Sequence, residues 1–392
     1  MHSKLLLSIM LLFVLVSFLF VGSVGASSEM WSRTYGGAVR SLVETSDGGY
    51  ALAGHIQLFD GEGTDFWLVK TDEYGNMEWN QTYDGSDKDW GSSLVETSDG
   101  GYALAGYTRS FATGEYNVWL IKTDAAGNME WNQTYEGVGL SLVGTSDGGY
   151  ALTGSGLFVK TDAYGNMEWN QTHGGTSLVE TFDGGFAYSG AGGSCQLVKT
   201  DANGNIQWSK AYGGAGWDSL HSLVLTSDGG FALAGETNSF SDGMADAWLV
   251  KTDANGNMEW YKTYGGTNYE YFSSLVLTSD GGFGLAGVTF SFGGGNSDFW
   301  LVKTDEYGNM KWNQTYGGTG DEGAHSLVET SDGCFALAGF KSSFGAWLVK
   351  TIPIALIPEF PSWIVLPLVI TATLMAIIYK KKLTKTPNQQ SY

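Results

Sequence analysis

The sequence predicts an all-β fold, a seven-bladed β-propeller of four-stranded blades, and three observations support that prediction. One block recurs seven times between residues 31 and 351, with no helical hydrophobic period inside it; such self-similarity is typical of propellers and other repeat folds. Each copy places Gly-containing turns between short apolar strands, as tight hairpins require. The recurring Trp has one copy before the first complete block and none after the last block, which indicates how the array closes.

Three residues recur in every copy: the Asp of an Asp-Gly turn, the Lys that ends an apolar run, and a Trp. The aspartates are Asp47, Asp99, Asp147, Asp183, Asp228, Asp280 and Asp332. The lysines are Lys70, Lys122, Lys160, Lys199, Lys251, Lys303 and Lys350. The tryptophans are Trp31, Trp79, Trp131, Trp169, Trp208, Trp260 and Trp312. One Trp therefore precedes the first Asp, and none follows the last Lys.

Each copy divides into four strands, a to d, with the types Ser-Leu-Val-Glu-Thr, Tyr-Ala-Leu-Ala-Gly, Trp-Leu-Val-Lys-Thr-Asp and Met-Glu-Trp-Asn-Gln-Thr-Tyr. A ring needs one blade built from both chain ends, because an open strand edge is a liability. We therefore expect strand d around Trp31 to complete the blade that ends at Lys350. A linear β-solenoid is the alternative, but it does not need this displaced strand.

Alternating strand direction puts the a–b and c–d turns on one face and the b–c and d–a loops on the other. The turns hardly vary between copies, whereas the loops do. Long b–c loops occupy residues 55–64, 107–116, 236–245 and 288–297, and copies 3 and 4 nearly lose them. We call the two sides the scaffold face and the loop face, and we expect function on the loop face.

The two chain ends depart from the repeat. Residues 1–26 have a basic start, an apolar run and a small-residue site, the features of a signal peptide. Residues 352–362 form a Pro-containing stalk, and residues 363–379 are an apolar segment of transmembrane length. The basic residues in 380–392 predict a cytoplasmic tail. These features predict a propeller displayed at the cell surface by a membrane anchor.

The stalk reads Ile357-Pro358-Glu359-Phe360-Pro361 before the apolar segment and its lysines. This arrangement resembles the PEF-type C-terminal sorting signals of archaeal surface proteins, and that resemblance implies processing by an archaeosortase. The chain differs from those signals in the ten residues 383–392 after the lysines.

The hairpin from Lys70 to Trp79 resembles the tryptophan-docking hairpin of quinoprotein-type propellers, in which the Trp wedges between blades. Its spacing is shorter and an adjacent Cys pair is absent, so the resemblance implies blade architecture and no cofactor. The whole repeat also resembles the secreted Gly- and Trp-rich propellers of archaeal surface proteins.

The recurring Asp and Lys are best explained as structural, because a hairpin needs its Asp in every copy whereas a catalytic pair is needed once. The run Asp201 to Asn205 is the nearest approach to a calcium loop, but its Gly stands too early and no Glu follows. No His pair has metal-ligand spacing. Cys195 and Cys334 lie three copies apart and are expected to be buried free thiols. We predict no metal, no cofactor and no catalytic residue.

The net charge of −21 argues against nucleic acid as a partner. Asn-Gln-Thr follows the strand-d Trp in four copies and has the form of a glycosylation acceptor. We predict that glycans attach on the outer wall at Asn80, Asn132, Asn170 and Asn313. The alternative is that this sequence only suits an exposed edge strand.

We expect a binding or adhesion module for an envelope or extracellular glycan or a surface protein. Aromatic side chains beside carboxylates on the loop face suit such ligands. The predicted ligand-binding residues are Trp90, Tyr116, Trp217, Tyr269 and Tyr271. One alternative is a polysaccharide hydrolase or lyase, which needs converging carboxylates. Its candidates are loop carboxylates that do not recur, namely Asp87, Asp89, Asp218, Asp321 and Glu322. The other alternative is a passive surface coat.

Overall fold

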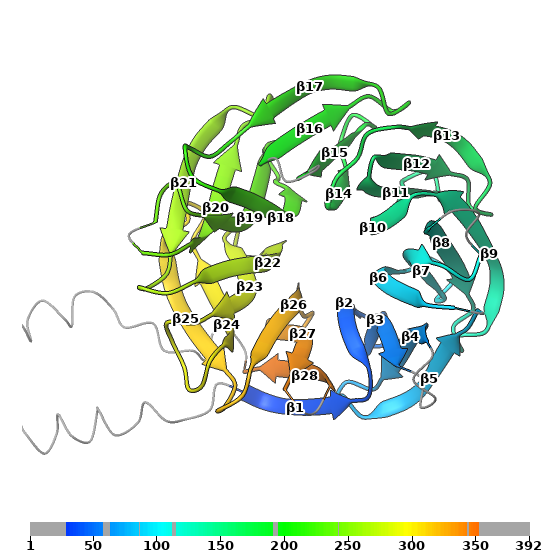
Figure 1. The fold of residues 1–392 in the computed structure, drawn as a ribbon, viewed down its shortest axis with the longest axis horizontal. Coiled ribbons are helices and arrows are strands. Elements are labelled where there is room, and N and C mark those ends of the chain that lie inside the picture. The colour runs from blue at the N-terminus through cyan, green and yellow to red at the C-terminus, as the bar shows by residue number, and fades with distance from the viewer. Residues whose placement is uncertain are drawn as a thin grey trace, which may run out of the picture. The chain divides into compact units, whose positions relative to one another are not determined.

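The protein is described by a computed structural model that covers residues 29–57, 63–85, 87–111, 115–190, 195–241, 243–342 and 345–352. These residues form seven four-stranded antiparallel sheets arranged as a ring (Figure 1). The predicted seven-bladed propeller is confirmed. The signal peptide, stalk, apolar segment and tail lie outside the described residues. Within the described part of the chain, no helix is long and apolar enough to cross a membrane.

Blades 1 to 4 follow the chain in order, from the innermost strand a to the outermost strand d. Blade 1 consists of β2 (Ala38–Glu44), β3 (Tyr50–Gln57), β4 (Thr64–Thr71) and β5 (Met77–Tyr83). Blade 2 consists of β6 (Asp89–Glu96), β7 (Tyr102–Thr108), β8 (Asn117–Thr123) and β9 (Met129–Glu136). Blade 3 consists of β10 (Val138–Gly144), β11 (Tyr150–Ser155), β12 (Leu157–Thr161) and β13 (Met167–Gln171). Blade 4 consists of β14 (Ser177–Glu180), β15 (Phe186–Ser189), β16 (Gln196–Thr200) and β17 (Ile206–Ala211).

Blades 5 to 7 continue the ring, and the last blade takes its outer strand from the start of the chain. Blade 5 consists of β18 (Asp218–Leu225), β19 (Phe231–Thr237), β20 (Asp246–Thr252) and β21 (Met258–Tyr264). Blade 6 consists of β22 (Glu270–Leu277), β23 (Phe283–Thr289), β24 (Asp298–Thr304) and β25 (Met310–Tyr316). Blade 7 consists of β26 (Glu322–Glu329), β27 (Phe335–Lys341), β28 (Gly345–Thr351) and β1 (Glu29–Tyr35).

The ring closes as the displaced Trp predicts. Strand β1 pairs antiparallel with β28, with Trp31 opposite Lys350 and Tyr35 opposite Ala346. The first described strand thereby becomes the outer strand of the last blade (Figure 1). Because the first and last strands of the propeller pair in one sheet, the edge of β28 is covered by β1.

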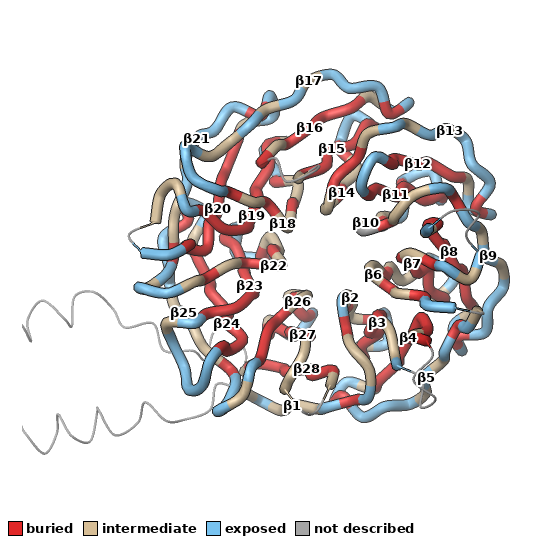
Figure 2. The backbone as a smooth tube through the Cα atoms, viewed as in Figure 1, coloured by how far each residue is buried: buried red, intermediate tan, exposed pale blue. Residues whose placement is uncertain are grey.

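Strands b and c are buried in almost every blade, whereas the outer d strands are largely exposed (Figure 2). At each joint the strand-d Trp meets an aromatic residue of the next blade edge-to-face, with ring centroids 5.8–6.1 Å apart. Such pairs stabilise beyond the area they bury. The same Trp also covers a c–d turn Gly of that next blade; at Gly127, where φ is 77°, an added Cβ would lie 2.6 Å from the Trp79 ring.

Candidate ligand-binding site

The recurring Asp and Lys lie on the scaffold face and support the hairpins. In blade 2, Lys122 Nζ lies 2.8 Å from Asp99 Oδ2 and 3.0 Å from Glu130 Oε2. An ion pair between this Lys and the turn Asp is present in all seven blades. Burial raises the pKa of Asp47 in blade 1, but hydrogen bonds from Lys70 and its own turn outweigh it and hold the pKa at about 2. The structural interpretation of these residues is confirmed.

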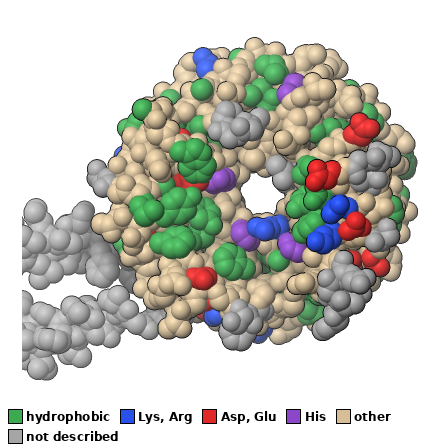
Figure 3. Space-filling model, viewed as in Figure 1, with side chains coloured by type: hydrophobic (Ala, Val, Ile, Leu, Met, Phe, Trp, Pro, Cys, Tyr) green, Lys and Arg blue, Asp and Glu red, His purple; other side chains and the backbone are tan. Residues whose placement is uncertain are grey.

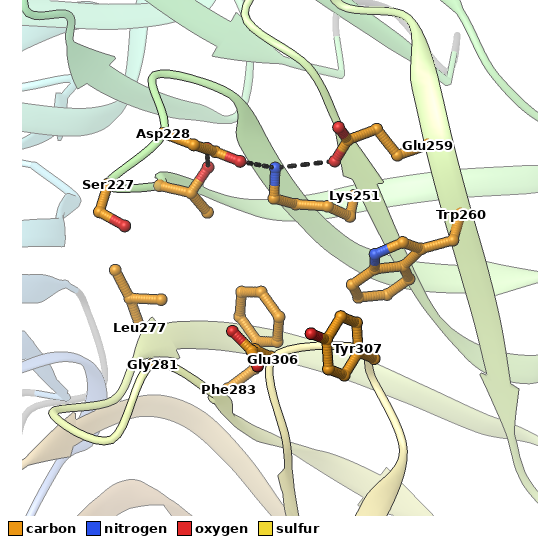
Figure 4. A pocket seen from close by; sticks show the side chains of 11 residues that line it. Ser227, Asp228, Lys251, Glu259, Trp260, Leu277, Gly281, Phe283, Glu306 and Tyr307 are labelled. Atoms are coloured by element: carbon orange, nitrogen blue, oxygen red, sulfur yellow. Dashed lines mark hydrogen bonds and ion pairs between the residues drawn. The ribbon is translucent and has the colours of Figure 1, made fainter.

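A pocket on the scaffold face is built from these repeated parts. Figure 4 shows it between blades 5 and 6, with Lys251 held between Asp228 and Glu259 and Tyr307 opposite. A second pocket between blades 2 and 3 uses the equivalent Lys122. Since the same parts recur around the ring, these pockets are a consequence of blade packing and do not single out one ligand.

The c–d turns are also structural. In the segment compared with a calcium loop, Asp201 Oδ1 accepts from the backbone N–H groups of Asn203 and Asn205 at 2.9 Å each. The Asp of the other described c–d turns does the same. No group of three or more His, Cys, Asp or Glu suited to a metal ion occurs among the described residues. Cys195 and Cys334 are buried and free, as expected.

The inner strand a of most blades has an irregularity near the loop face. In six blades the pairing of strands a and b skips one strand-a residue, a β-bulge. Bulges re-aim side chains and are frequent beside functional sites. The bulged residues are Arg40, Ser92, Leu140, His221, Ser273 and His325. Figure 3 shows His and Lys or Arg side chains gathered at the opening in the middle of the ring.

Three polar side chains, two of them at bulges, lie near one another where blade 7 packs against blade 1. Arg40 of β2 and His325 of β26 approach to 3.1 Å between Nη1 and Nε2. His55 of β3 is close enough for its charge, with that of Arg40, to lower the pKa of His325, which burial chiefly depresses to about 3. Burial and Arg40 likewise lower the pKa of His55 to about 4. We call Arg40, His55 and His325 the seam cluster.

Blade 2 presents three aromatic rings in mutual contact on the loop face. Trp90 and Tyr107 have ring centroids 4.9 Å apart, and Tyr116 lies 6.1 Å from Trp90 and 5.5 Å from Tyr107. The Arg109 guanidinium stands 5.6 Å from the Tyr116 centroid. All three rings are half-buried. We call Trp90, Tyr107 and Tyr116 the blade 2 aromatic cluster.

A second group of aromatic side chains joins blades 5 and 6. The Tyr269 and Tyr271 ring centroids are 5.7 Å apart, and the Tyr269 hydroxyl donates to the buried Glu236 carboxylate. His221 Nε2 lies 3.5 Å from Glu236 Oε1. Burial, followed by the bond to Glu236, raises the pKa of Tyr269 well above its usual value. We call Tyr269, Tyr271, Glu236 and His221 the blade 5–6 cluster.

The structure thus brings four of the five predicted aromatic residues into two clusters. It does not bring in Trp217, which is 54% exposed and makes no ring contact with any described residue. Sequence reasoning missed Tyr107, Glu236 and the seam cluster. The signal for His221 and His325 was present, since both stand directly before Ser-Leu-Val; Arg40 stands at the same place.

The prediction that the loop carboxylates do not recur is wrong for three of them. Asp89, Asp218 and Glu322 open strand a at one equivalent position, which is occupied in blade 6 by Glu270. All are buried. Asp218 accepts from Ser239 Oγ at 2.6 Å and Gly214 N at 2.9 Å, so it holds its own loops together. The other two candidates, Asp87 and Asp321, are exposed.

The four predicted sequon asparagines are exposed on the outer d strands, which suits glycosylation but does not test it. In three of the four blades the side chain also has a structural contact. Its Oδ1 accepts from a strand-c Trp indole at 3.1–3.4 Å in Asn80, Asn132 and Asn313. Blade 3 has Leu157 in place of that Trp, so Asn170 lacks this donor.

The fold and these clusters define the protein as a seven-bladed β-propeller with a varied loop face. No protein-family model matches the chain, and no curated protein matches it. Among solved structures it is similar to the Pan2 WD40 domain of Neurospora crassa, with TM-score 0.57 and 10% identity over 82% of this chain and 94% of that one. It is similar to Sqt1 of Chaetomium thermophilum, with TM-score 0.51 and 12% identity over 80% and 82%.

A third similar structure is BamB of Moraxella catarrhalis, with TM-score 0.49 and 13% identity over 83% of this chain and 99% of that one. At such low identity, the likenesses to the Pan2 WD40 domain and to Sqt1 show the propeller fold alone.

Proposed function

We propose that the protein is a carbohydrate-binding module that uses its loop face. The observation that carries this proposal is the blade 2 aromatic cluster, three half-buried rings in mutual contact. The cross-strand pair Trp90–Tyr107 is aromatic on both strands, whereas the equivalent pairs of the other bulged blades are not. Sugar rings present apolar C–H faces, and amphipathic aromatic side chains supply matching area with a polar edge. A few placed polar groups then fix the orientation of the ligand.

The blade 5–6 cluster supplies such polar groups. The Tyr269 hydroxyl and the His221 imidazole are half-buried and are held by the buried Glu236 carboxylate. Hydroxyl and imidazole groups can both donate to and accept from sugar hydroxyl groups. A protein ligand would also contact aromatic residues, and a glycan array on which the wild type binds nothing would favour a protein ligand.

We also propose that the propeller is displayed at the cell surface. The support is in the sequence: a signal-like start in residues 1–26 and an apolar segment followed by lysines in residues 363–382. Archaeosortase processing at residues 357–361 and an archaeal origin remain part of this proposal. Membrane fractionation with surface protease treatment tests it, since a cytosolic, protease-resistant protein would contradict it.

The hydrolase or lyase alternative has weaker support. Of the five candidate carboxylates, Asp89, Asp218 and Glu322 are buried and accept hydrogen bonds from neighbouring loop residues. The two exposed carboxylates, Asp87 and Asp321, lie in different blades, 2 and 7. A glycosidase needs two carboxyl groups on either side of an accessible bond. We therefore favour binding without turnover.

The test is a glycan array probed with the wild type and with Trp90→Ala. We expect the variant to lose roughly tenfold or more in affinity, since a lost stacking contact is worth about 1–3 kcal/mol. Trp217→Ala is the matched control, because Trp217 is an exposed Trp of the same loop face outside both clusters. Equal losses in the two variants, or no glycan bound by the wild type, would contradict the proposal.

A further inference from the structure

Arg40 carries a positive charge that no described carboxylate neutralises. Its guanidinium Nη1 lies 3.1 Å from His325 Nε2. By contrast, Arg109 on the same face lies 3.9 Å from Asp87. In a protein of net charge −21, an arginine beside imidazoles and without a counter-ion among the described residues is a candidate anion site.

The two imidazoles of the seam cluster contribute N–H donors and no charge near neutral pH. Arginine can only donate, so His325 Nε2 accepts from it and the ring proton stands on Nδ1. His55 Nδ1 is buried without a hydrogen-bond partner among the described residues. An unpaired buried polar atom costs free energy that a ligand can recover.

We infer that the seam cluster binds the carboxylate of an acidic sugar, such as a uronic acid. A guanidinium fork matches a planar carboxylate in a bidentate way. The cluster has a single positive charge, on Arg40, which matches the single negative charge of a carboxylate better than the two charges of a phosphate dianion. A sulfate ester shares that charge, and the experiment separates the two.

The position of Arg40 links the seam cluster to both aromatic groups. Its charge lowers the pKa of Tyr107 in blade 2 and of Tyr271 in blade 6, against the larger raising effect of burial. The inference that the carboxylate belongs to a sugar rests on the proposed carbohydrate function.

Calorimetry with trigalacturonate, its neutral methyl ester and a sulfated trisaccharide tests the inference on the full chain. We expect the acid to bind about tenfold or more tightly than the ester, and Arg40→Gln to abolish that preference. Arg40→Lys is expected to restore part of it. Lys88→Gln, which removes an exposed positive charge from a d–a loop, is the control and should leave the preference intact. Equal binding of acid and ester, or tighter binding of the sulfated sugar, would overturn the carboxylate assignment.

Imidazole NMR with monomeric glucuronate gives a readout that needs no stacking. We expect glucuronate to shift the His55 and His325 resonances, and methyl glucoside to leave them unchanged. If Trp90→Ala abolishes binding of all sugars while Arg40→Gln changes nothing, the proposed function stands and this inference fails. If glucuronate shifts both imidazoles but Trp90→Ala has no effect, the anion site stands and the aromatic proposal fails. No shift and no binding would overturn both.

Discussion

The Tyr35 hydroxyl donates a 2.7 Å hydrogen bond to the backbone carbonyl of Gly75. Strand β1 is therefore paired with β28 on one side and bonded to the c–d turn of blade 1 on the other. The same bond joins ordinary neighbouring blades, at 2.8 Å from Tyr83 to Gly127 and at 2.6 Å from Tyr264 to Gly308. The contact between β1 and blade 1 is thus that of an ordinary joint, and it is the pairing of β1 with β28 that brings together segments from opposite ends of the propeller.

Deleting residues 29–35 should open the ring. The β28 edge would then present unpaired N–H and C=O groups together with buried residues such as Trp347, and such edges associate with other chains. We expect soluble oligomers or aggregates by size-exclusion chromatography with light scattering. A synthetic peptide of residues 27–37 added in trans should restore the monomer.

Tyr35→Phe is the matched point change, with Tyr83→Phe as the comparison at an ordinary joint. Each leaves a carbonyl without its donor, so each should lose about 1–2 kcal/mol of unfolding free energy. A truncated protein that stays monomeric and as stable as the wild type would contradict the closure argument.

Asp99→Asn should destabilise the protein more than Lys122→Met. Lys122 is 6% exposed, whereas Asp99 is 57% exposed. Removing the Asp charge therefore leaves a buried ammonium short of a partner, at a cost of about 2 kcal/mol, while removing the Lys leaves two carboxylates that water can solvate. Chemical denaturation of both variants and of the double variant measures this; an Asp99→Asn change without effect would mean that Glu130 suffices.

The blade number, the four-strand unit and the closing strand could all be predicted because each follows from residues that recur at regular intervals in the sequence. Trp31 standing before the first repeat is enough to identify the closing strand. The structural role of Asp47 and Lys70 could be predicted for the same reason, since a feature present in every copy serves the fold.

The seam cluster could not be predicted in this way. Arg40 and His325 are 285 positions apart in the chain, and they meet because ring closure brings β2 of blade 1 beside β26 of blade 7. The equivalence of the loop carboxylates could have been found in the sequence. Asp89, Asp218, Glu270 and Glu322 each stand four residues before the Ser of a Ser-Leu-Val run, but the residue is Asp in two copies and Glu in two, and the other copies have no carboxylate there.

If glycans are attached, occupancy should be highest at Asn170. The Asn132 side chain is held at both atoms, with Oδ1 3.1 Å from the Trp119 indole and Nδ2 3.3 Å from Met129 Sδ. Asn170 has no strand-c indole to hold it, so its Nδ2 is freer to enter a transferase. Mass spectrometry of tryptic peptides from native protein would show the difference. Unmodified peptides at all four sites would end the glycosylation prediction, and higher occupancy at Asn132 would contradict the ranking.

Asp298 of β24 and Glu322 of β26 form a pair of buried carboxylates between blades 6 and 7. The two side chains are 3% and 2% exposed. Burial, with the Glu322 charge as the second cause, raises the pKa of Asp298 to about 6. The folded protein therefore keeps a proton here between about pH 4 and 6 that the unfolded chain loses.

The sign of the resulting pH dependence follows directly. A carboxyl with a raised folded pKa contributes stability that falls as pH rises from about 4 to 6 and then stays constant, a loss of about 2–3 kcal/mol. Asp47 acts in the opposite direction and in another window: its pKa of about 2 gives stability above about pH 4 that is lost as pH falls toward 2.

Asp298→Asn should therefore stabilise the protein at about pH 7 by roughly 2 kcal/mol and change little near pH 4, because Asn mimics the protonated acid. Urea unfolding at both pH values measures the difference. Asp321→Asn is the control, since Asp321 is exposed on the same loop face and should show no pH-dependent effect. An equal change at both pH values, or a loss of stability at neutral pH, would mean that the Asp298 carboxylate is ionised at little cost and that Glu322 does not oppose it.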